Sequence, residues 1–299
     1  MAMLIGKRRS IAKLAAGAAV GAAAALGARA AWRAWRRFDL HVFPRTMFGR
    51  ALVYTVRDAA GDPVRVLNVG GGYQSATYLG DRWAEPALAY YRAFDRMFEA
   101  EDSDSEGVDG AAATGGFRIR RALMLGGGGC SYPKHLLTAR GGVSIDVVER
   151  DPAIAAIARR LFFVDRLEHL LAERGEQDRF RLIIDDALAY LRACTRSYDA
   201  IINDVYVGTA AVPGLNGAEA ARLAKSRLVP GGLYLSNAVA EPSEEGYAAL
   251  LGYTRELGAV FARVHVIAAN DSDFGGEDNY LVIATDGDYA FSDVIPFAE

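Results

Sequence analysis

A run of four glycines after one apolar segment, with an acid closing the next apolar segment, most constrains how this chain can fold. Residues 123–125 are predicted to end a buried strand, and Gly126 to Gly129 follow directly. Glycines let the backbone turn tightly and come close to a ligand. Residues 145–148 predict a second buried strand ending in Glu149, roughly 20 residues past the glycines, where a carboxylate can accept hydrogen bonds from ribose hydroxyls. The pattern predicts a nucleoside site, and the alternative is a tight turn with a solvated acid.

The composition is that of a globular chain. Its 299 residues are 52% hydrophobic, enough for one large domain or two smaller ones. A net charge of -3 and no sustained basic face in the main body argue against nucleic acid as a partner, because phosphate binding needs clustered Lys and Arg. Cys130 and Cys194 form no CxxC motif and the histidines are scattered, so we expect neither a metal site nor a disulfide framework.

Residues 1–40 are predicted to be a signal or a membrane-associated segment. Arg8 and Arg9 begin a stretch that resembles a twin-arginine export signal, and residues 28–30 offer a small-residue cleavage site. Against export, the uncharged stretch 14–28 is shorter than the roughly 20 residues that cross a bilayer, and basic residues flank it on both sides.

Two further alternatives for this segment stay open. Trp32 and Trp35 lie among arginines, which fits an interfacial helix on an anionic lipid surface, and an Ala-rich helix without a target is the other alternative. An exported protein would leave a nucleoside donor behind in the cytoplasm. An active enzyme would therefore be cytoplasmic, or membrane-anchored with its catalytic domain inside.

A small β-domain with a helix is predicted over residues 48–98. Residues 51–56 and 64–69 have the pattern of a hairpin, and residues 85–97 repeat apolar side chains at helical spacing. Residues 99–116 show no apolar periodicity and are predicted to be a flexible linker between two domains.

The main domain, residues 117–288, alternates predicted strands and helices, which indicates a doubly wound, Rossmann-like α/β sheet of about seven strands. Asp151 and Pro152 are typical of a helix start. In such sheets ligands bind at the carboxyl ends of the strands. The predicted strands are residues 119–125, 143–149, 180–184, 200–203, 233–236, 264–268 and 280–285.

The residues at these strand ends resemble those of the polyamine aminopropyltransferases, the spermidine synthase family, whose catalytic domain is similar to the S-adenosylmethionine-dependent methyltransferases. Gly126 to Gly128 match the family's nucleoside loop, and Glu149 within Val-Glu-Arg-Asp-Pro matches its ribose-binding strand end. Asp186-Ala187 matches the pair that holds the adenine amino group. Tyr-Asp-Ala-Ile-Ile-Asn-Asp204 matches the strand whose last Asp is the catalytic base.

The resemblance runs from about residue 48 to residue 285 and includes the β-domain. Gln74, in Gly-Gly-Gly-Tyr-Gln, resembles the end of the family's Asp-Gly-x-x-Gln turn and is assigned by resemblance to the donor site. Tyr90 and Tyr91 fall near the family's Tyr-His-Glu helix, and Asn237 stands at the family's strand-five Gln. These three residues are assigned by resemblance to the acceptor.

A sulfonium donor carries its own activating charge, so such an enzyme mainly aligns two substrates and accepts a proton from the attacking amine. By resemblance Asp204 takes this role. The alternative for Asp204 is an N-cap or turn residue before residues 205–209, and Asp186 can cap the next helix while it also binds adenine.

Four departures from the family's pattern bear on the acceptor. Gly129 and Val207 stand where the family has acids that hold amine groups, Asn237 replaces a Gln, and Phe274 stands at the family's Tyr. An ammonium removed from water without a partner costs several kcal/mol. The sequence therefore argues against a dicationic acceptor such as putrescine.

The resemblance implies aminopropyl transfer from decarboxylated S-adenosylmethionine to an amine or another nucleophile, without a metal. One alternative is a methyltransferase that uses S-adenosylmethionine itself, because Gly129 leaves room where the family's acid would repel the donor's carboxylate. Another is a non-catalytic, membrane-associated nucleoside-binding protein, motivated by the altered pocket and residues 1–40. The β-domain with Gln74 favours the first interpretation, and a homodimer stays open.

Overall fold

The computed structural model of the protein describes residues 39–103, 116–207, 210–211, 214–269 and 278–296. Residues 1–38, which hold nearly all of the predicted signal or membrane segment, lie outside the described residues, as does Phe274. Within the part that is described, no helix combines the length and the apolar character needed to cross a membrane.

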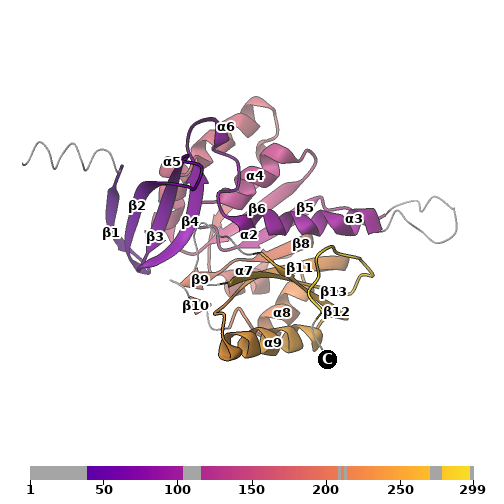
Figure 1. The fold of residues 1–299 in the computed structure, drawn as a ribbon. Helices are drawn as coiled ribbons and strands as arrows, with labels where there is room; N and C mark the ends of the chain where they lie inside the picture. Colours follow the sequence, from indigo (N-terminus) through magenta and orange to yellow (C-terminus); the bar gives the residue numbers. More distant parts are fainter. Residues whose placement is uncertain (1–38, 104–115, 208–209, 212–213, 270–277, 297–299) are drawn as a thin grey trace, which may run out of the picture.

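A small antiparallel sheet precedes the main domain (Figure 1). The predicted hairpin is present, with Ala51 opposite Val69. The first and last strands of this sheet were not predicted. The first is half exposed, and the last, Gly-Tyr-Gln-Ser-Ala-Thr-Tyr, has no branched aliphatic residue to signal a strand. Gln74 therefore lies in a strand and not in a turn. In order, the strands are β1 (His41–Thr46), β2 (Gly49–Arg57), β3 (Pro63–Val69) and β4 (Gly72–Tyr78).

The helix predicted at residues 85–97 begins later and is interrupted. A short 3-10 turn, η1 (Gly80–Arg82), precedes α2 (Ala89–Ala93), which passes into η2 (Phe94–Phe98) and α3 (Glu99–Ser103). The first residues of the predicted linker 99–116 are therefore helical. A hydrogen bond holds their position, because the Glu99 carboxylate accepts the Ser292 backbone N–H at 2.8 Å. Residues 104–115 lie outside the described residues.

The main domain is a seven-stranded sheet, and all seven predicted strands are present. Its order is β12-β13-β11-β8-β5-β6-β7, with β13 antiparallel to both of its neighbours. The prediction of a doubly wound α/β sheet is confirmed. The strands are β5 (Arg121–Leu125), β6 (Ser144–Glu149), β7 (Phe180–Ile184), β8 (Tyr198–Asn203), β11 (Leu228–Ala240), β12 (Arg263–Ala268) and β13 (Asp278–Thr285).

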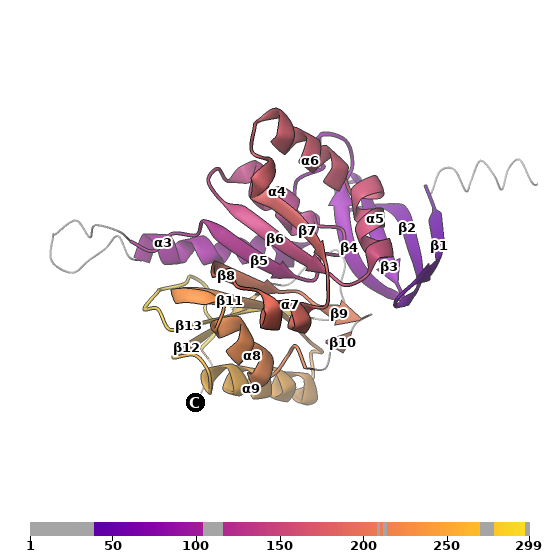
Figure 2. The ribbon, with the colours of Figure 1, turned by 180° about the vertical axis from the view of Figure 1, so that it is seen from behind.

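Helices cover both faces of this sheet (Figures 1 and 2). Along β5, Ala122 and Met124 enter one core with α4 and α6, whereas Leu123 and Leu125 enter the other with α7, α8 and α9. This alternation is why the strand is apolar throughout. The helices are α4 (Ser131–Ala139), α5 (Pro152–Leu161), α6 (Val164–Glu173), α7 (Ala187–Ala193), α8 (Ala218–Lys225) and α9 (Glu244–Gly258); η3 (Gln177–Arg179), β9 (Tyr206–Val207) and β10 (Ala210–Ala211) complete the elements.

Two helices of the main domain hold the small sheet in place. Its inner face packs on α5, where Leu67 shares a core with Ile157. On α4, the Ser131 hydroxyl donates to the Ala76 carbonyl at 2.6 Å, and buried Lys134 donates to the Thr77 hydroxyl at 2.7 Å. Burial lowers the pKa of Lys134 to about 7. Since α4 directly follows the glycine run, these contacts bring β4 to the edge of the predicted site.

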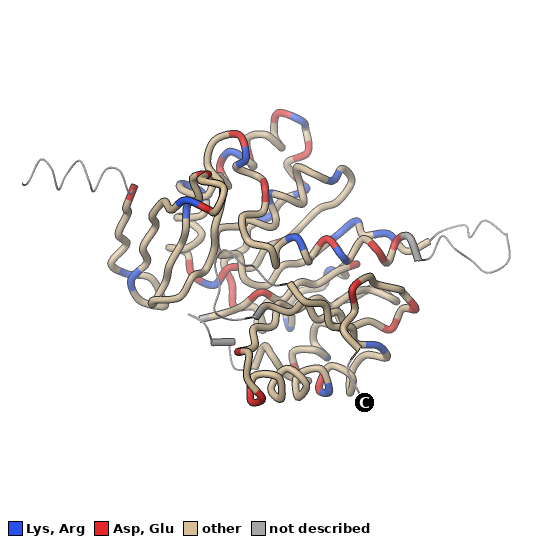
Figure 3. Tube along the Cα trace, viewed as in Figure 1, with Lys and Arg blue, Asp and Glu red and all other residues tan. Residues whose placement is uncertain are grey.

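Figure 3 shows basic and acidic positions intermixed along the described chain.

Candidate active site

A pocket opens at the carboxyl edge of the sheet, where β5 and β8 lie side by side although they are not consecutive in the chain. This is the position at which doubly wound sheets bind ligands. The loops stay paired beyond the strands, because the Gly126 N–H donates to the Val148 carbonyl and the Asp204 N–H donates to the Leu125 carbonyl, each at 2.9 Å. The cavity measures about 890 Å³ including its open mouth, and its lining is Phe48, Val69, Gln74, Tyr91, Gly126, Gly127, Gly128, Val148, Glu149, Arg150, Ile154, Asp185, Asp186, Ala187, Asp204, Val205, Tyr206 and Leu215.

Two glycines of the run, Gly126 and Gly128, are required by their surroundings. Gly126 has φ +88°, and a Cβ atom there would lie 2.3 Å from the Asp204 carbonyl oxygen. A Cβ atom on Gly128, at φ +48°, would lie 3.2 Å from the carbonyl oxygen of Gln74. The loop therefore packs directly against the backbone that carries Asp204 on one side and Gln74 on the other.

Gly129 differs from what the sequence indicated. Its Cβ atom would lie 2.6 Å from a ring carbon of Phe162 and 2.7 Å from the Ser75 hydroxyl. The expectation that Gly129 leaves room in the donor pocket is wrong, because these two side chains, from distant parts of the chain, fill the space. The family's acid does not fit at this position here.

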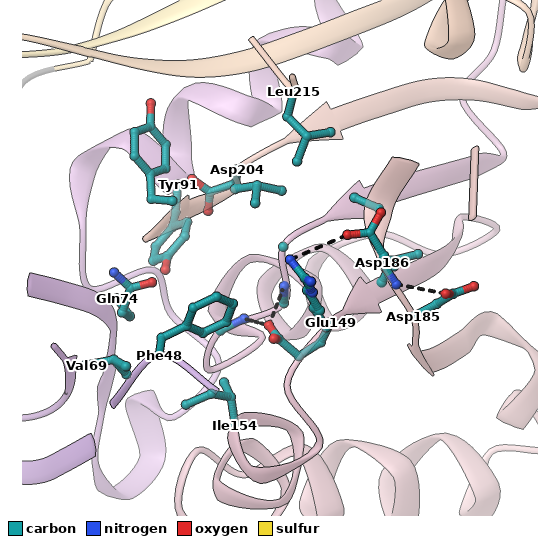
Figure 4. Close-up of a pocket in the computed structure, with 18 residues that line it drawn as sticks. Phe48, Val69, Gln74, Tyr91, Glu149, Ile154, Asp185, Asp186, Asp204 and Leu215 are labelled. Atoms are coloured by element: carbon teal, nitrogen blue, oxygen red, sulfur yellow. Dashed lines mark hydrogen bonds and ion pairs between the residues drawn. The ribbon is translucent and has the colours of Figure 1, made fainter. Parts of the chain in front are cut away.

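Glu149 is buried, with 8% of its surface exposed, so the alternative of a solvated surface acid is wrong. One carboxylate oxygen accepts the Gly127 and Gly128 backbone N–H groups at 3.1 and 3.0 Å (Figure 4). The other accepts the Asp151 N–H at 2.8 Å. Burial raises the pKa of Glu149, and these N–H groups oppose that shift. Each carboxylate oxygen has two acceptor sites, so the second oxygen can accept one further donor.

Asp186 caps α7, as the sequence predicted, and also faces the pocket. One carboxylate oxygen accepts the Leu188 and Ala189 backbone N–H groups at 3.0 and 3.1 Å. The other lies 3.7 Å from a guanidinium nitrogen of Arg150. Ala187 lines the same part of the pocket. The sequence analysis missed Arg150, whose signal is its place directly after Glu149.

Asp204 directly follows β8 and faces the other part of the pocket. No helix follows it, since the chain continues into β9, so the alternative of a helix N-cap is wrong. The Asn237 side-chain amide donates to its carboxylate at 3.0 Å. Burial raises the pKa of Asp204 to about 6, although hydrogen bonds from Asn237 and Tyr90 act in the opposite direction.

Three tyrosines surround this carboxylate. The rings of Tyr90 and Tyr91 lie 4.2 Å apart, and Figure 4 shows Tyr91 beside Asp204. Tyr206, which the sequence analysis missed, donates its hydroxyl to the Asn237 carbonyl at 2.5 Å. Within the described part of the chain, the buried side-chain oxygen of Asn237 has no hydrogen-bond partner. Around Asp204 the pocket thus combines this carboxylate with the rings of Tyr91 and Tyr206, a set that suits an ammonium group.

The predicted site residues thus meet at one pocket. Gln74 and Tyr91 line it, while Tyr90 and Asn237 contact Asp204. Of Val207 only the backbone, in β9, is described. Where side chains are described, no group of three His, Cys, Asp or Glu residues is placed to hold a metal ion.

Relatives in sequence and in structure are known for this chain. No family model matches the chain. The polyamine aminopropyltransferase of Mycobacterium tuberculosis is 30% identical over 161 residues, which are 52% of this chain but 30% of that protein. The polyamine aminopropyltransferase of Agathobacter rectalis is 36% identical over 85 residues, 28% of each chain. The matches thus span less than a third of these curated relatives.

Solved structures share the fold. A probable spermidine synthase from Corynebacterium glutamicum superposes with a TM-score of 0.62 at 21% identity, over 84% of this chain and 81% of that one. A spermidine synthase in complex with the transition-state analogue AdoDATO superposes with a TM-score of 0.59 at 16% identity, over 83% and 73% of the two chains. The chain is therefore similar in sequence to polyamine aminopropyltransferases over about half its length, and it has the fold of the spermidine synthases.

Proposed function

We propose that the chain is a transferase of the polyamine aminopropyltransferase type, which moves the aminopropyl group of decarboxylated S-adenosylmethionine to an amine. One observation carries this proposal. One half-site is the glycine loop bound to Glu149, and the other is the buried carboxylate of Asp204. The two half-sites adjoin, because Gly126 packs directly on the Asp204 backbone. The names of the matched relatives support it.

In this proposal the donor lies across the strand ends. Glu149 accepts a ribose hydroxyl at the free acceptor site of its second oxygen, and Asp186 with Ala187 receives adenine. Gln74 lies on the far side of the glycine loop, next to the sulfonium end of the donor. The proposal therefore puts the adenosyl group between Asp186 and Asp204.

The charges of the lining favour the decarboxylated donor. Four carboxylates and one guanidinium line the pocket, namely Glu149, Asp185, Asp186 and Asp204 against Arg150. Arg150 pairs with Asp186, which follows β7. In the sheet β7 lies three strands from β8, a separation of about 14 Å at about 4.8 Å per strand. The carboxylate of S-adenosylmethionine would lie near Asp204 with no cation of the lining to pair with it. A doubly cationic donor is attracted instead.

The reaction needs positioning and one proton acceptor. The neutral acceptor nitrogen attacks the methylene carbon next to the sulfonium sulfur, the carbon–sulfur bond breaks, and its electron pair stays on the thioether of 5′-methylthioadenosine. Before that step, Asp204 and the rings of Tyr91 and Tyr206 hold the ammonium form of the acceptor, and the Asp204 carboxylate takes one proton from it to give the neutral nitrogen. The alkylated nitrogen leaves as the ammonium ion of the product.

The identity of the product tests this proposal. The full chain, incubated with decarboxylated S-adenosylmethionine and a panel of monoamines and diamines, is expected to release 5′-methylthioadenosine and to add one aminopropyl group to an amine. The assay is chromatography with mass spectrometry, and boiled protein is the control. Release of S-adenosylhomocysteine from S-adenosylmethionine, with the decarboxylated donor left intact, would instead identify a methyltransferase.

A pH profile tests the role of Asp204. The base must be ionised, and its raised pKa of about 6 in the free protein means that the rate, measured with both substrates far below saturation, should fall as the pH drops through about 6. An ordinary, exposed Asp would give this decline near pH 4. A profile that stays flat down to pH 5 would exclude Asp204 as the base.

A further inference from the structure

Arg150 lines the pocket, and neither the glycine loop nor Asp204 accounts for it. The inference drawn for Arg150 rests on the proposed function, in which the end of the pocket at Arg150 and Asp186 holds adenine. We propose that Arg150 is a specificity residue for the donor, whose guanidinium lies flat on one face of the adenine ring while Asp186 holds it there.

The anchor for this guanidinium is rigid. Asp186 is fixed by two backbone N–H groups at the start of α7, and its remaining oxygen lies 3.7 Å from Arg150 (the dashed line at Asp186 in Figure 4). Arg150 itself follows Glu149, whose carboxylate is bound to the glycine loop. The Arg150 guanidinium thus lies next to a fixed carboxylate, although about half of the side chain (53%) is exposed.

The lining of the pocket suits a flat aromatic base. Apolar side chains of Ile154, Val205 and Leu215 line the cavity together with Arg150. A guanidinium is planar and weakly hydrated, so it stacks on aromatic faces, whereas the ammonium of a lysine does not. Its pairing with Asp186 also offsets its charge, so it does not repel a cationic donor.

Binding of 5′-methylthioadenosine tests the inference, because this probe contains the base but carries no charge. Calorimetry of the full chain is expected to show that Arg150→Ala raises Kd about tenfold, in the range found for base stacking on side chains. Arg150→Lys is expected to restore less than half of the loss in binding free energy. The exposed Arg160→Ala, on α5, is the matched control and should bind like wild type.

A double-mutant cycle tests the role of Asp186 as the anchor. If Asp186 acts partly by holding Arg150, Asp186→Asn should weaken binding less in the Arg150→Ala background than in wild type. Additive effects of the two changes would contradict this anchoring.

The outcomes separate this inference from the proposed function. If wild type does not bind the probe, the donor site itself is wrong. If wild type binds but Arg150→Ala binds equally well or more tightly, Arg150 has no stacking role while the proposed function stands. Full affinity in Arg150→Lys would show that charge, and not the planar group, matters, which also overturns the inference.

Discussion

Replacing Asp204 with Asn is expected to lower kcat about 10²–10⁴-fold, the usual contribution of a general base. Asn keeps the shape of the side chain and still accepts the hydrogen bond from Asn237, so the fold and the Kd for 5′-methylthioadenosine should change little. The measurements are steady-state kinetics with the decarboxylated donor and calorimetry with the product nucleoside.

Asp178→Asn provides the control for this change, since Asp178 is exposed and far from the strand ends that form the pocket. It should leave both kinetics and binding unchanged. Wild-type turnover by Asp204→Asn would remove Asp204 from the mechanism and favour a site that binds a nucleoside without catalysis.

Gly126→Ala is expected to disable both halves of the site at once. The new methyl group would lie 2.3 Å from the Asp204 carbonyl oxygen, and the backbone has φ +88°, so the loop and the end of β8 must separate. Strain and overpacking together should destabilise the fold by about 3 kcal/mol. Nucleoside binding and turnover should both be lost, as measured by denaturant unfolding, calorimetry and kinetics.

The matched control is Gly252→Ala within α9, where a Cβ atom meets nothing within 4 Å. Alanine is the better helix former, so this variant should be more stable by about 0.5–1 kcal/mol and fully active. A Gly126→Ala protein with the stability and turnover of wild type would contradict the proposed packing of loop against strand.

The sequence was sufficient for the seven-stranded sheet because buried strands covered on both faces are apolar throughout. The sequence predicted strands less well where pairing with a neighbouring strand, and not the apolar composition, defines the strand, as in β4. Residues 230–232, Pro-Gly-Gly, have a turn signature but lie inside β11, where the register against β8 shifts between Leu228 and Leu233. Gly231, at φ +75°, makes the backbone irregular there, and the strand continues through it.

The polar residues at the strand ends could also be predicted from the sequence, because the sheet topology brings Glu149, Asp186 and Asp204 to one edge. The environment of Gly129 could not be predicted, because Phe162, directly after α5, and Ser75, in β4, are distant in the sequence but reach it in the fold. Tyr206 likewise has no motif, and its role depends on contact with Asn237 across the sheet edge.

Calorimetry of the full chain with three nucleosides tests the central claim, that this pocket binds an adenosyl sulfonium donor. We expect 5′-methylthioadenosine and decarboxylated S-adenosylmethionine to bind, and S-adenosylmethionine to bind at least about tenfold more weakly, a difference of about 1.4 kcal/mol. Glu149→Gln should weaken all three, because its carboxylate organises the glycine loop. If none of the three nucleosides binds the wild-type chain, the claim is wrong.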